Sequence, residues 1–157
     1  MNNNEFYEIV KDILDNKEVK KLDNYKHHYI YTRLEHSISV SHHCYVIGKI
    51  LHLNYKSLAR AGLLHDFFLY DCENKETRPK NHITTHPFIA LKNANKYFKL
   101  SKMECNLILT HMWPLTPIPP MSLEGLILTF VDKFCAFKEW SVFVTYYLNK
   151  KIKEDFI

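Results

Sequence analysis

Four polar residues interrupt helix faces that are otherwise apolar in this sequence. Each lies four residues from an apolar residue, and residues four apart share one face of a helix. The pairs are His36 with Val40, Ala61 with His65, Leu107 with His111, and Leu128 with Asp132. Each of the four polar side chains is therefore predicted to point into the interior of the protein.

Imidazole and carboxylate groups inside a protein need partners. A buried carboxylate such as that of Asp132 is costly unless it is paired, and buried imidazole nitrogens must also be satisfied. One divalent cation surrounded by these groups would satisfy all of them together. Zn, Fe, Mn, Co and Ni all accept imidazole and carboxylate ligands. The chemistry predicted by these residues is therefore metal binding.

The dipeptide His65-Asp66 strengthens this prediction. Adjacent residues point about 100° apart in the middle of a helix, but both can reach one ion where a helix ends. The run AGLLHDFFLYD is where we expect such an end. A single buried histidine is more often a hydrogen-bonded core residue than a ligand, so the prediction depends on the whole order of residues. That order is His36, His65-Asp66, His86, His111 and Asp132.

Apolar periodicity predicts the helices that would position these residues. The predicted helices cover 4–15, 35–52, 55–69 and 123–148, with one from Pro87 to Phe98 and one that starts with a capping box of Ser101 and Glu104. A polar loop is expected over 70–85, and a rigid loop where four of the six prolines crowd into 114–120. No segment shows convincing strand alternation. The sequence predicts an all-α, compact helical bundle that forms a single domain over 1–157.

Composition excludes several other classes of protein. A length of 157 residues with 46% hydrophobic and 24% charged residues is typical of one globular domain. No apolar run reaches 18 residues, so no membrane partner is expected. The polar N-terminus lacks a signal peptide, so we expect a cytoplasmic protein with four reduced cysteines. The net charge of +4 forms no basic stripe, which argues against stable nucleic-acid binding.

The local sequence around these residues resembles the HD-domain superfamily of metal-dependent phosphohydrolases. TRLEHSISVSHHCYVIGKIL is similar to the first-histidine helix of that family, ARAGLLHDFFLYD to its histidine–aspartate helix, and LTFVDKFCAFKEW to its last-aspartate helix. THPFIAL and LTHMWP are similar to the extra histidine segments of members that hold two metals. The resemblance covers about residues 30–140.

The resemblance implies a helical bundle with two divalent transition-metal ions (Fe, Mn, Zn, Co or Ni) in its core. The ligands of the first metal would be His36, His65, Asp66 and Asp132, and Asp66 would bridge to a second metal that His86 and His111 also bind. The glycine often found soon after the histidine–aspartate pair is replaced by Phe67 and Phe68. That difference leaves the ligands in place but does not allow substrate preference to be transferred.

The remaining histidines have less specific interpretations. His82 precedes His86 by four residues and is the main rival to it as a ligand, although His86-Pro87 matches the family string better. His43 is expected to be packed near the site and His42 to lie near the surface. The rest are expected to be surface or loop residues, namely His27, His28 and His52.

The implied function is hydrolysis of a phosphate ester of a nucleotide or other small phosphorylated metabolite. A hydroxide that bridges the two metals would attack phosphorus, and Asp66 would position it. Cationic groups should neutralise the phosphate, and Lys133 is the first candidate. The other predicted substrate-binding residues are Arg33, Arg78, Lys80 and His82.

Two other functions are compatible with the same residues. A di-iron oxygenase can use the same order of histidines and aspartates, and a non-catalytic binding module can retain the fold. Neither the substrate nor the oligomeric state can be predicted. The aromatic-rich segment 140–148 could be a partner surface or part of the core.

Overall fold

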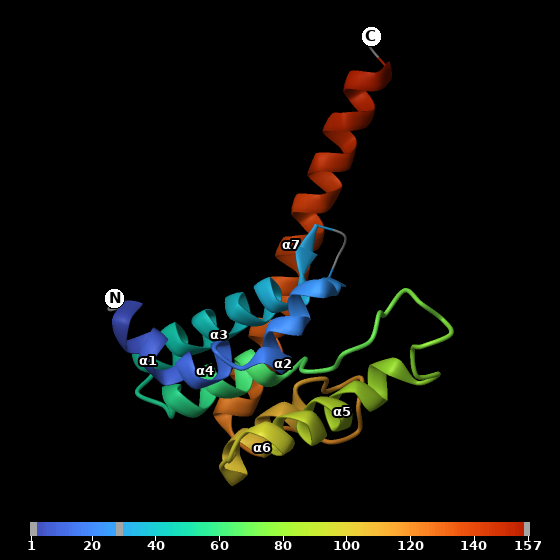
Figure 1. Cartoon of the computed structure of the whole chain (residues 1–157). Coiled ribbons are helices and arrows are strands. Elements are labelled where there is room, and N and C mark those ends of the chain that lie inside the picture. Colours follow the sequence, from blue (N-terminus) through green and yellow to red (C-terminus); the bar gives the residue numbers. More distant parts are fainter. Residues whose placement is uncertain (1–2, 28–29, 156–157) are drawn as a thin grey trace.

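A computed structural model describes residues 3–27 and 30–155 and is almost entirely helical (Figure 1). The prediction of an all-α fold is confirmed. The elements, in chain order, are α1 (Asn3–Leu14), α2 (Lys17–Lys20), the 3-10 helix η1 (Lys21–Asn24), β1 (Lys26–His27), β2 (Tyr31–Thr32), α3 (Arg33–Ile50), α4 (Tyr55–Leu64), α5 (His82–Tyr97), α6 (Lys102–Thr110) and α7 (Leu123–Asp155).

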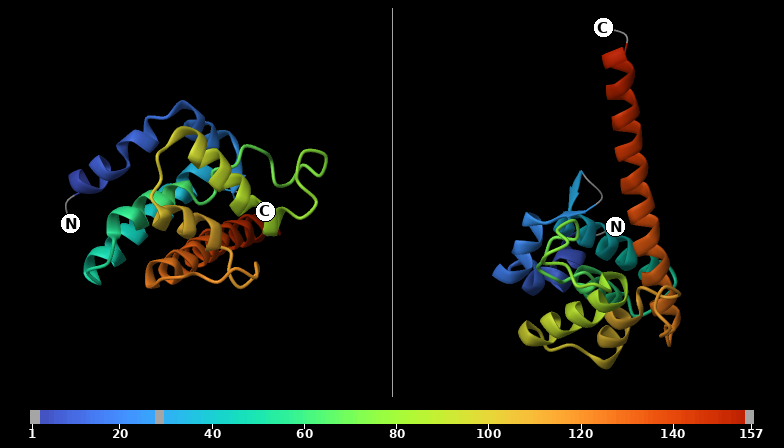
Figure 2. Two further views of the ribbon diagram at one scale, coloured as in Figure 1. Left: turned by 90° about the horizontal axis from the view of Figure 1, so that it is seen from below. Right: turned by 90° about the vertical axis from the view of Figure 1, so that its right-hand side faces the viewer.

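The centre of the bundle is the pair α3 and α4, which lie side by side along most of their length (Figure 1). Helix α1 packs on α4, α7 packs on α3, and the pair α5 and α6 covers the opposite side (Figures 1 and 2). The core between them consists of fully buried apolar side chains such as Val40, Leu58, Leu64, Leu107 and Leu128. The metal-type residues predicted from the sequence lie within this packed region.

Helices α3 and α4 approach each other closely at Gly62. A Cβ atom at this position would lie 3.0 Å from the Cα atom of Ser41 on α3, closer than ordinary contacts allow. The hydroxyl of Ser41 donates a hydrogen bond to the carbonyl of Ala59 at 2.7 Å, which ties the two helices at the same level. This close contact holds the last turn of α4 against α3. His65 and Asp66 follow directly after that turn, so their positions depend on it.

Local capping signals explain where the site-bearing helices start. Thr32 and Glu35 form a capping box at the N-terminus of α3, and the predicted box of Ser101 and Glu104 is present at the N-terminus of α6. Asn54 caps α4 by accepting a hydrogen bond from the backbone N–H of Ser57. These side chains satisfy backbone donors that the first turn of a helix leaves unpaired.

Helix α4 ends at Leu64, earlier than the predicted end at residue 69. The backbone N–H of Phe67 bonds to Leu64 and that of Phe68 to Asp66, so the chain leaves the helical path at the histidine–aspartate pair. His65 is the C-cap and Asp66 follows it in the turn. The expectation that this dipeptide sits at a helix end is confirmed.

Helix α5 starts at His82, so the prediction that Pro87 opens this helix is wrong. Pro87 lies inside the helix, where its missing N–H removes one backbone hydrogen bond. The hydroxyls of Thr84 and Thr85 both donate to the carbonyl of Asn81 and support the extra first turn. His82 and His86 therefore lie one turn apart on the same helix.

Helix α7 is longer than predicted, and its C-terminal part projects away from the body of the protein (Figures 1 and 2). Ser122 accepts a hydrogen bond from the N–H of Gly125 near its start, in agreement with the predicted start. Among the described residues, no helix is both long and apolar enough to span a membrane.

A polar cluster joins α1 to the central helices. The carboxylate of Glu5 accepts hydrogen bonds from the hydroxyls of Tyr45 (2.9 Å) and Tyr55 (3.0 Å) and from the ammonium group of Lys49. These three donors, Lys49 foremost, lower the pKa of Glu5 from its usual 4.5 to about 2. A carboxyl group with a lowered pKa stabilises the fold above its unfolded pKa and loses that effect as the pH falls through its folded pKa.

We predict that Glu5→Gln lowers the melting temperature at pH 7, because the charged acceptor of Lys49 is lost. The difference from the wild type should shrink as the pH falls from 4.5 towards 2, where Glu5 becomes protonated in the folded protein. Thermal unfolding followed by circular dichroism at several pH values measures this. Glu8→Gln, an exposed change on the same helix, is the control and should have little effect at any pH. A difference that stays constant down to pH 2 would contradict the prediction.

Candidate metal centre

Five elements bring six predicted ligands into one buried cluster. Helix α3 contributes His36, the end of α4 contributes His65 and Asp66, and three further elements each contribute one residue. These are His86 on α5, His111 at the C-cap of α6 and Asp132 on α7. All six side chains are buried. Residues 96 positions apart in the sequence are therefore in direct contact.

One half of the cluster surrounds Asp132. Its Oδ1 atom lies 3.2 Å from Nε2 of His36 and 3.3 Å from Nε2 of His65. The same His65 nitrogen lies 3.8 Å from Oδ2 of Asp66. This half contains the four residues that the family resemblance implies for a first metal.

The other half surrounds the second oxygen of Asp66. Its Oδ1 atom lies 3.3 Å from Nε2 of His86 and 3.7 Å from Nε2 of His111, and these two nitrogens are 3.0 Å apart. Asp66 therefore lies between the two halves, with one carboxylate oxygen towards each.

Backbone carbonyls fix the orientation of three of the imidazole rings. Nδ1 of His65, His86 and His111 lies 2.8, 3.0 and 2.7 Å from the carbonyls of Gly62, His82 and Ile108, respectively. A carbonyl only accepts hydrogen bonds, so Nδ1 must be the protonated nitrogen in each ring. The Nε2 atom of each neutral ring then presents a lone pair to the cluster.

Apart from the hydrogen bond between His36 and Asp132, the cluster consequently brings hydrogen-bond acceptors together. Nε2 of His65 and Oδ1 of Asp66 are fully buried and have no hydrogen-bond partner. Each such buried polar atom costs about 1–3 kcal/mol if nothing satisfies it. Divalent cations bound by these lone pairs and carboxylates would remove that cost, so the residues present fit a metal centre.

The environment also sets protonation states that suit metal binding. Burial lowers the pKa of His111 to about 3, which keeps its ring neutral. Burial acts to raise the pKa of Asp66 and of Asp132, but the surrounding histidines outweigh it and lower both pKa values well below the usual range. His36 and His65 differ, because burial acts to lower their pKa values but the neighbouring carboxylates outweigh it and raise both, that of His36 to about 10. A metal must therefore displace a proton from His36.

Two residues of the site were missed by the sequence analysis. The expectation that His27 is a surface or loop residue is wrong, since its ring stacks on that of His36 with centroids 3.9 Å apart and its Nε2 lies 4.0 Å from Oδ2 of Asp66. Glu139 is buried beside both rings. It lies seven residues after Asp132, two turns along the same face of α7, and this spacing was the one available signal. His28 lies outside the described residues.

Glu139 orients two imidazole rings with one carboxylate. Oε1 accepts a hydrogen bond from Nδ1 of His36 at 2.9 Å, and Oε2 lies 3.0 Å from Nδ1 of His27. Burial acts to raise the pKa of Glu139, but the hydrogen bonds from His27 and His36 lower it to about 2, so the group stays ionised. A carboxylate behind a ligating histidine fixes the ring and makes it a stronger ligand.

The structure brings His86, and not its rival His82, into the cluster. Nδ1 of His82 is within hydrogen-bond distance of the Tyr70 hydroxyl at 2.9 Å, and its Nε2 lies 3.5 Å from Sγ of Cys72. Burial lowers the pKa of His82 to about 4. His82 therefore lies at the edge of the site as a neutral ring.

Arg33 does not face the site, so its prediction as a substrate-binding residue is wrong. Its side chain is completely buried, and its guanidinium group donates to the carbonyls of Phe68 (2.8 Å) and Tyr70 (3.2 Å) and to Sγ of Cys72 (3.3 Å). The guanidinium also lies over the Phe68 ring, 3.8 Å from its centroid. Arg33 holds the chain that follows the histidine–aspartate pair.

A cavity of about 230 Å³ opens on the cluster. Its walls include Asp66, His27, His82 and Lys133, and Leu115 from the proline-rich loop closes one side. The ammonium group of Lys133 donates to the carbonyls of His111 (3.1 Å) and Thr129 (3.3 Å). Burial lowers the pKa of Lys133, and Asp132 opposes that effect.

Arg78 and Lys80 lie apart from the cluster and line a neighbouring cavity of about 520 Å³. Both cavities share His82 and Leu115 in their walls. The two cations are therefore positioned beside the metal-facing cavity and not within it. The expectation that Arg78 and Lys80 neutralise the phosphate together with Lys133 stays a prediction.

The other described histidines lie outside the cluster. His43 is half-buried and bonds through Nδ1 to the carbonyl of Ser39 at 2.7 Å. His42 is half-buried against the ring of Phe6, with centroids 5.1 Å apart, so it is less exposed than expected. His52 is exposed, as predicted.

Comparison with known proteins agrees with this arrangement. A family model described as HD domain matches residues 33–136, which is most of the chain. The chain belongs to the HD-domain family. The predicted membership of this superfamily of metal-dependent phosphohydrolases is confirmed. No curated protein and no solved structure gives a significant match. All six clustered residues fall within the matched range, whereas His27 and Glu139 lie just outside it.

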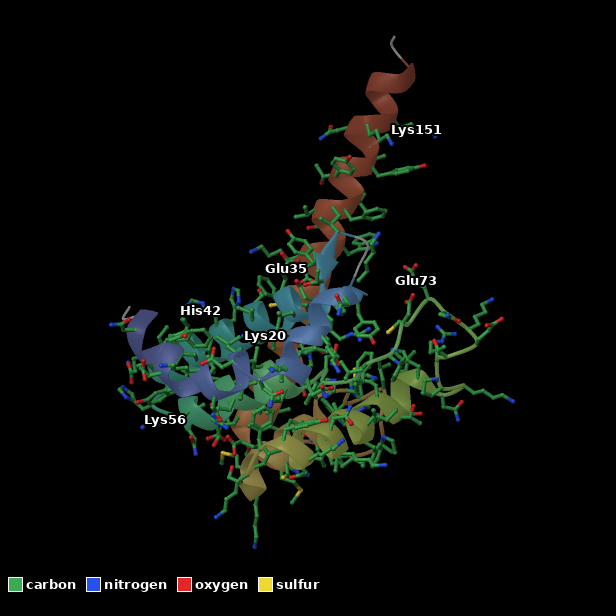
Figure 3. All side chains as sticks on the ribbon, in the orientation of Figure 1. Lys20, Glu35, His42, Lys56, Glu73 and Lys151 are labelled. Carbon is green, nitrogen blue, oxygen red and sulfur yellow. The ribbon has the colours of Figure 1, made fainter. Side chains whose placement is uncertain are left out.

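We predict that Glu139→Ala weakens metal binding by about 10- to 100-fold, because it removes the group that orients His36 and His27. Competition with a chromogenic chelator for Zn²⁺ or Co²⁺ measures the affinity, and elemental analysis measures the bound metal. Glu73→Ala removes an exposed carboxylate from the loop before α5 and is the matched control (Figure 3). Unchanged affinity in a folded Glu139→Ala protein would rule out the orienting role.

Proposed function

We propose that the protein hydrolyses a phosphate ester of a nucleotide or other small phosphorylated metabolite with two divalent transition-metal ions in the candidate metal centre. The observation that supports this most strongly is the convergence of buried lone pairs on Asp66 and Asp132, two of which have no hydrogen-bond partner. HD-family membership supports a metal-dependent hydrolase, and the ester substrate is the further step that we propose.

The ligand assignment follows the two halves of the cluster. His36, His65 and Asp132 would hold one ion, His86 and His111 would hold the other, and Asp66 would contribute one oxygen to each. When bound, such ions lower the pKa of a coordinated water and neutralise charge on a phosphoryl group. The chain's own contribution is to keep the His111 ring neutral and the carboxylates of Asp66 and Asp132 ionised at neutral pH.

Lys133 is positioned to neutralise a reacting phosphoryl group. An ammonium group has three donors, and two of them are directed at the carbonyls of His111 and Thr129. These two hydrogen bonds hold the group at the wall of the metal-facing cavity, and the third donor can be given to a phosphate oxygen. Such a fixed donor is worth most where charge develops in the transition state.

The neighbouring cavity suits the remainder of a small substrate. Arg78 and Lys80 provide positive charge there, and His82, which is held by Tyr70, lies in the walls of both cavities. Its volume of about 520 Å³ falls within the range of small-molecule sites. We propose that the reacting phosphoryl group lies beside Lys133 and that a second anionic group, where the substrate has one, lies beside Arg78.

We predict that the metal-loaded protein releases phosphate from members of a panel of nucleotides and sugar phosphates. Asp66→Ala should lose most of the bound metal and all measurable turnover, because both halves of the centre share this carboxylate. Elemental analysis and a phosphate-release assay measure the two effects. Asp71→Ala, an exposed change five residues later, is the control and should retain both.

Three results would contradict the proposed function. These are full turnover in Asp66→Ala, no phosphate release from any ester by metal-loaded protein, and oxygen-dependent turnover with a mixed-valence di-iron signal in electron paramagnetic resonance. The third result would instead identify the di-iron oxygenase that can use the same ligands.

We predict different kinetic effects at Lys133 and Arg78. Lys133→Met should lower kcat/KM by about 100-fold for every phosphate ester that the enzyme accepts, because it removes a donor to the reacting group. Arg78→Ala should raise KM by about tenfold only for esters that carry a second anionic group, since one charge-assisted hydrogen bond is lost. Matched substrates with one and with two phosphates measure both effects, and Lys75→Ala is the surface control. Equal effects of the Arg78 change on both substrates would refute its assigned position.

A further inference from the structure

The outer surface of α7 carries a long series of exposed aromatic side chains. Six of them have between 48% and 65% of their surface exposed, namely Phe130, Phe134, Phe137, Trp140, Tyr146 and Tyr147. The segment 140–148, which the sequence left open as either core or partner surface, is therefore not part of the core of the described chain. In Figure 3 the far end of the projecting part, around the labelled Lys151, has no other described element beside it.

Three of these aromatic side chains belong to a seam along α7 that has the spacing of a helix–helix interface. Along α7 the positions Phe130, Phe134, Phe137, Ser141, Val144 and Leu148 follow one another at alternating intervals of four and three residues. This is the 3.5-residue period with which one helix packs along another. Five of the six positions are apolar, so the seam is suited to a helical partner.

The exposed area is the size that a stable dimer needs. A fully exposed aromatic side chain presents roughly 200 Å², so the three seam phenylalanines with the neighbouring Trp140 and Tyr147 present on the order of 600 Å². The largest apolar patch on an ordinary monomer is about 300–600 Å², whereas each partner in a standard interface buries about 800 Å². This side of α7 reaches the upper end of the first range and, with the exposed Leu148 added, approaches the second value.

The charge pattern of this segment favours a second copy of the chain over a membrane surface. Helices that lie on membranes carry lysine and arginine along their polar face. Between Lys138 and Lys150, α7 has no lysine or arginine. Lys133 and Lys138 flank the body-borne half of the seam, whereas residues 140–148 carry no charged side chain of the kind that selects a different partner in heteromeric coiled coils. A self-complementary apolar seam is what a two-fold homodimer requires.

We propose that the protein forms a homodimer in which α7 packs antiparallel against α7 of a second copy. The first half of the seam, 130–137, lies along the body, and the second half, 141–148, projects beyond it (Figures 1 and 2). A two-fold antiparallel arrangement places the projecting half of each copy against the body-borne half of the other. Every seam position is then covered, and the same residues meet on both copies.

Sedimentation equilibrium of the full chain tests this proposal. The wild type should have twice the 18.8 kDa mass of one chain at micromolar concentration. Phe130→Glu and Leu148→Glu, at the two ends of the seam, should each raise the dissociation constant at least tenfold, because a charge is placed in the interface. Phe88→Glu on α5 replaces an equally exposed phenylalanine (51%) outside α7, and this variant should remain dimeric.

Because the changed side chains are exposed, the variants should retain the helical circular dichroism of the wild type. A wild type that is monomeric at these concentrations would overturn the proposal. The proposal would also fail if either seam variant remained fully dimeric while folded, or if Phe88→Glu dissociated the dimer as strongly. Binding of a monomeric wild type to vesicles of phosphatidylcholine and phosphatidylglycerol would assign the surface to a membrane instead.

Discussion

The arrangement of lone pairs around Asp66 and Asp132 is the constraint on which the rest of the structure depends. Apolar packing of α3, α4 and α7 brings imidazole nitrogens and carboxylate oxygens to within 3.0–3.8 Å of one another, and two of these atoms have no hydrogen-bond partner. Without a cation these two unpartnered atoms oppose folding, because they are buried in a medium of low dielectric constant. With cations bound, the same groups stabilise the fold, since ligand binding to the native state adds directly to its stability. Metal binding and stability are therefore linked in this protein.

The imidazole rings of the predicted ligands are oriented in two different ways. His65, His86 and His111 are anchored locally, each by a backbone carbonyl three or four residues earlier in its own element. These rings need no other element to acquire their tautomer and direction. His36 differs, because its anchor is Glu139 on α7. The first half of the centre is therefore complete only when α7, which also supplies Asp132, is docked on α3.

The sequence predicted the local features well, because periodicity and capping are local signals. The capping box of Ser101, the helix end at His65 and the inward direction of His36 could all be read from neighbouring residues. His27 could not, because the β1–β2 hairpin carries it to a site whose other members are distant in the sequence. Arg33 was misassigned for a related reason. An arginine close in sequence to a predicted metal ligand suggests a binding site for an anionic substrate. Only the fold shows that the guanidinium group of Arg33 donates its hydrogen bonds to the carbonyls of Phe68 and Tyr70 instead.

The two halves of helix α7 lie in different environments, one packed on the body and one projecting beyond it, and the stability of the projecting half depends on what packs against it. Its first half is held by the body, whereas its projecting half carries exposed aromatic and aliphatic side chains such as Trp140, Tyr146, Tyr147 and Leu148. Helices in water gain little from propensity alone, and most of their stability in proteins comes from packing. The projecting half thus acquires its missing packing from a second chain, and its helical order should then depend on protein concentration as the dimer does.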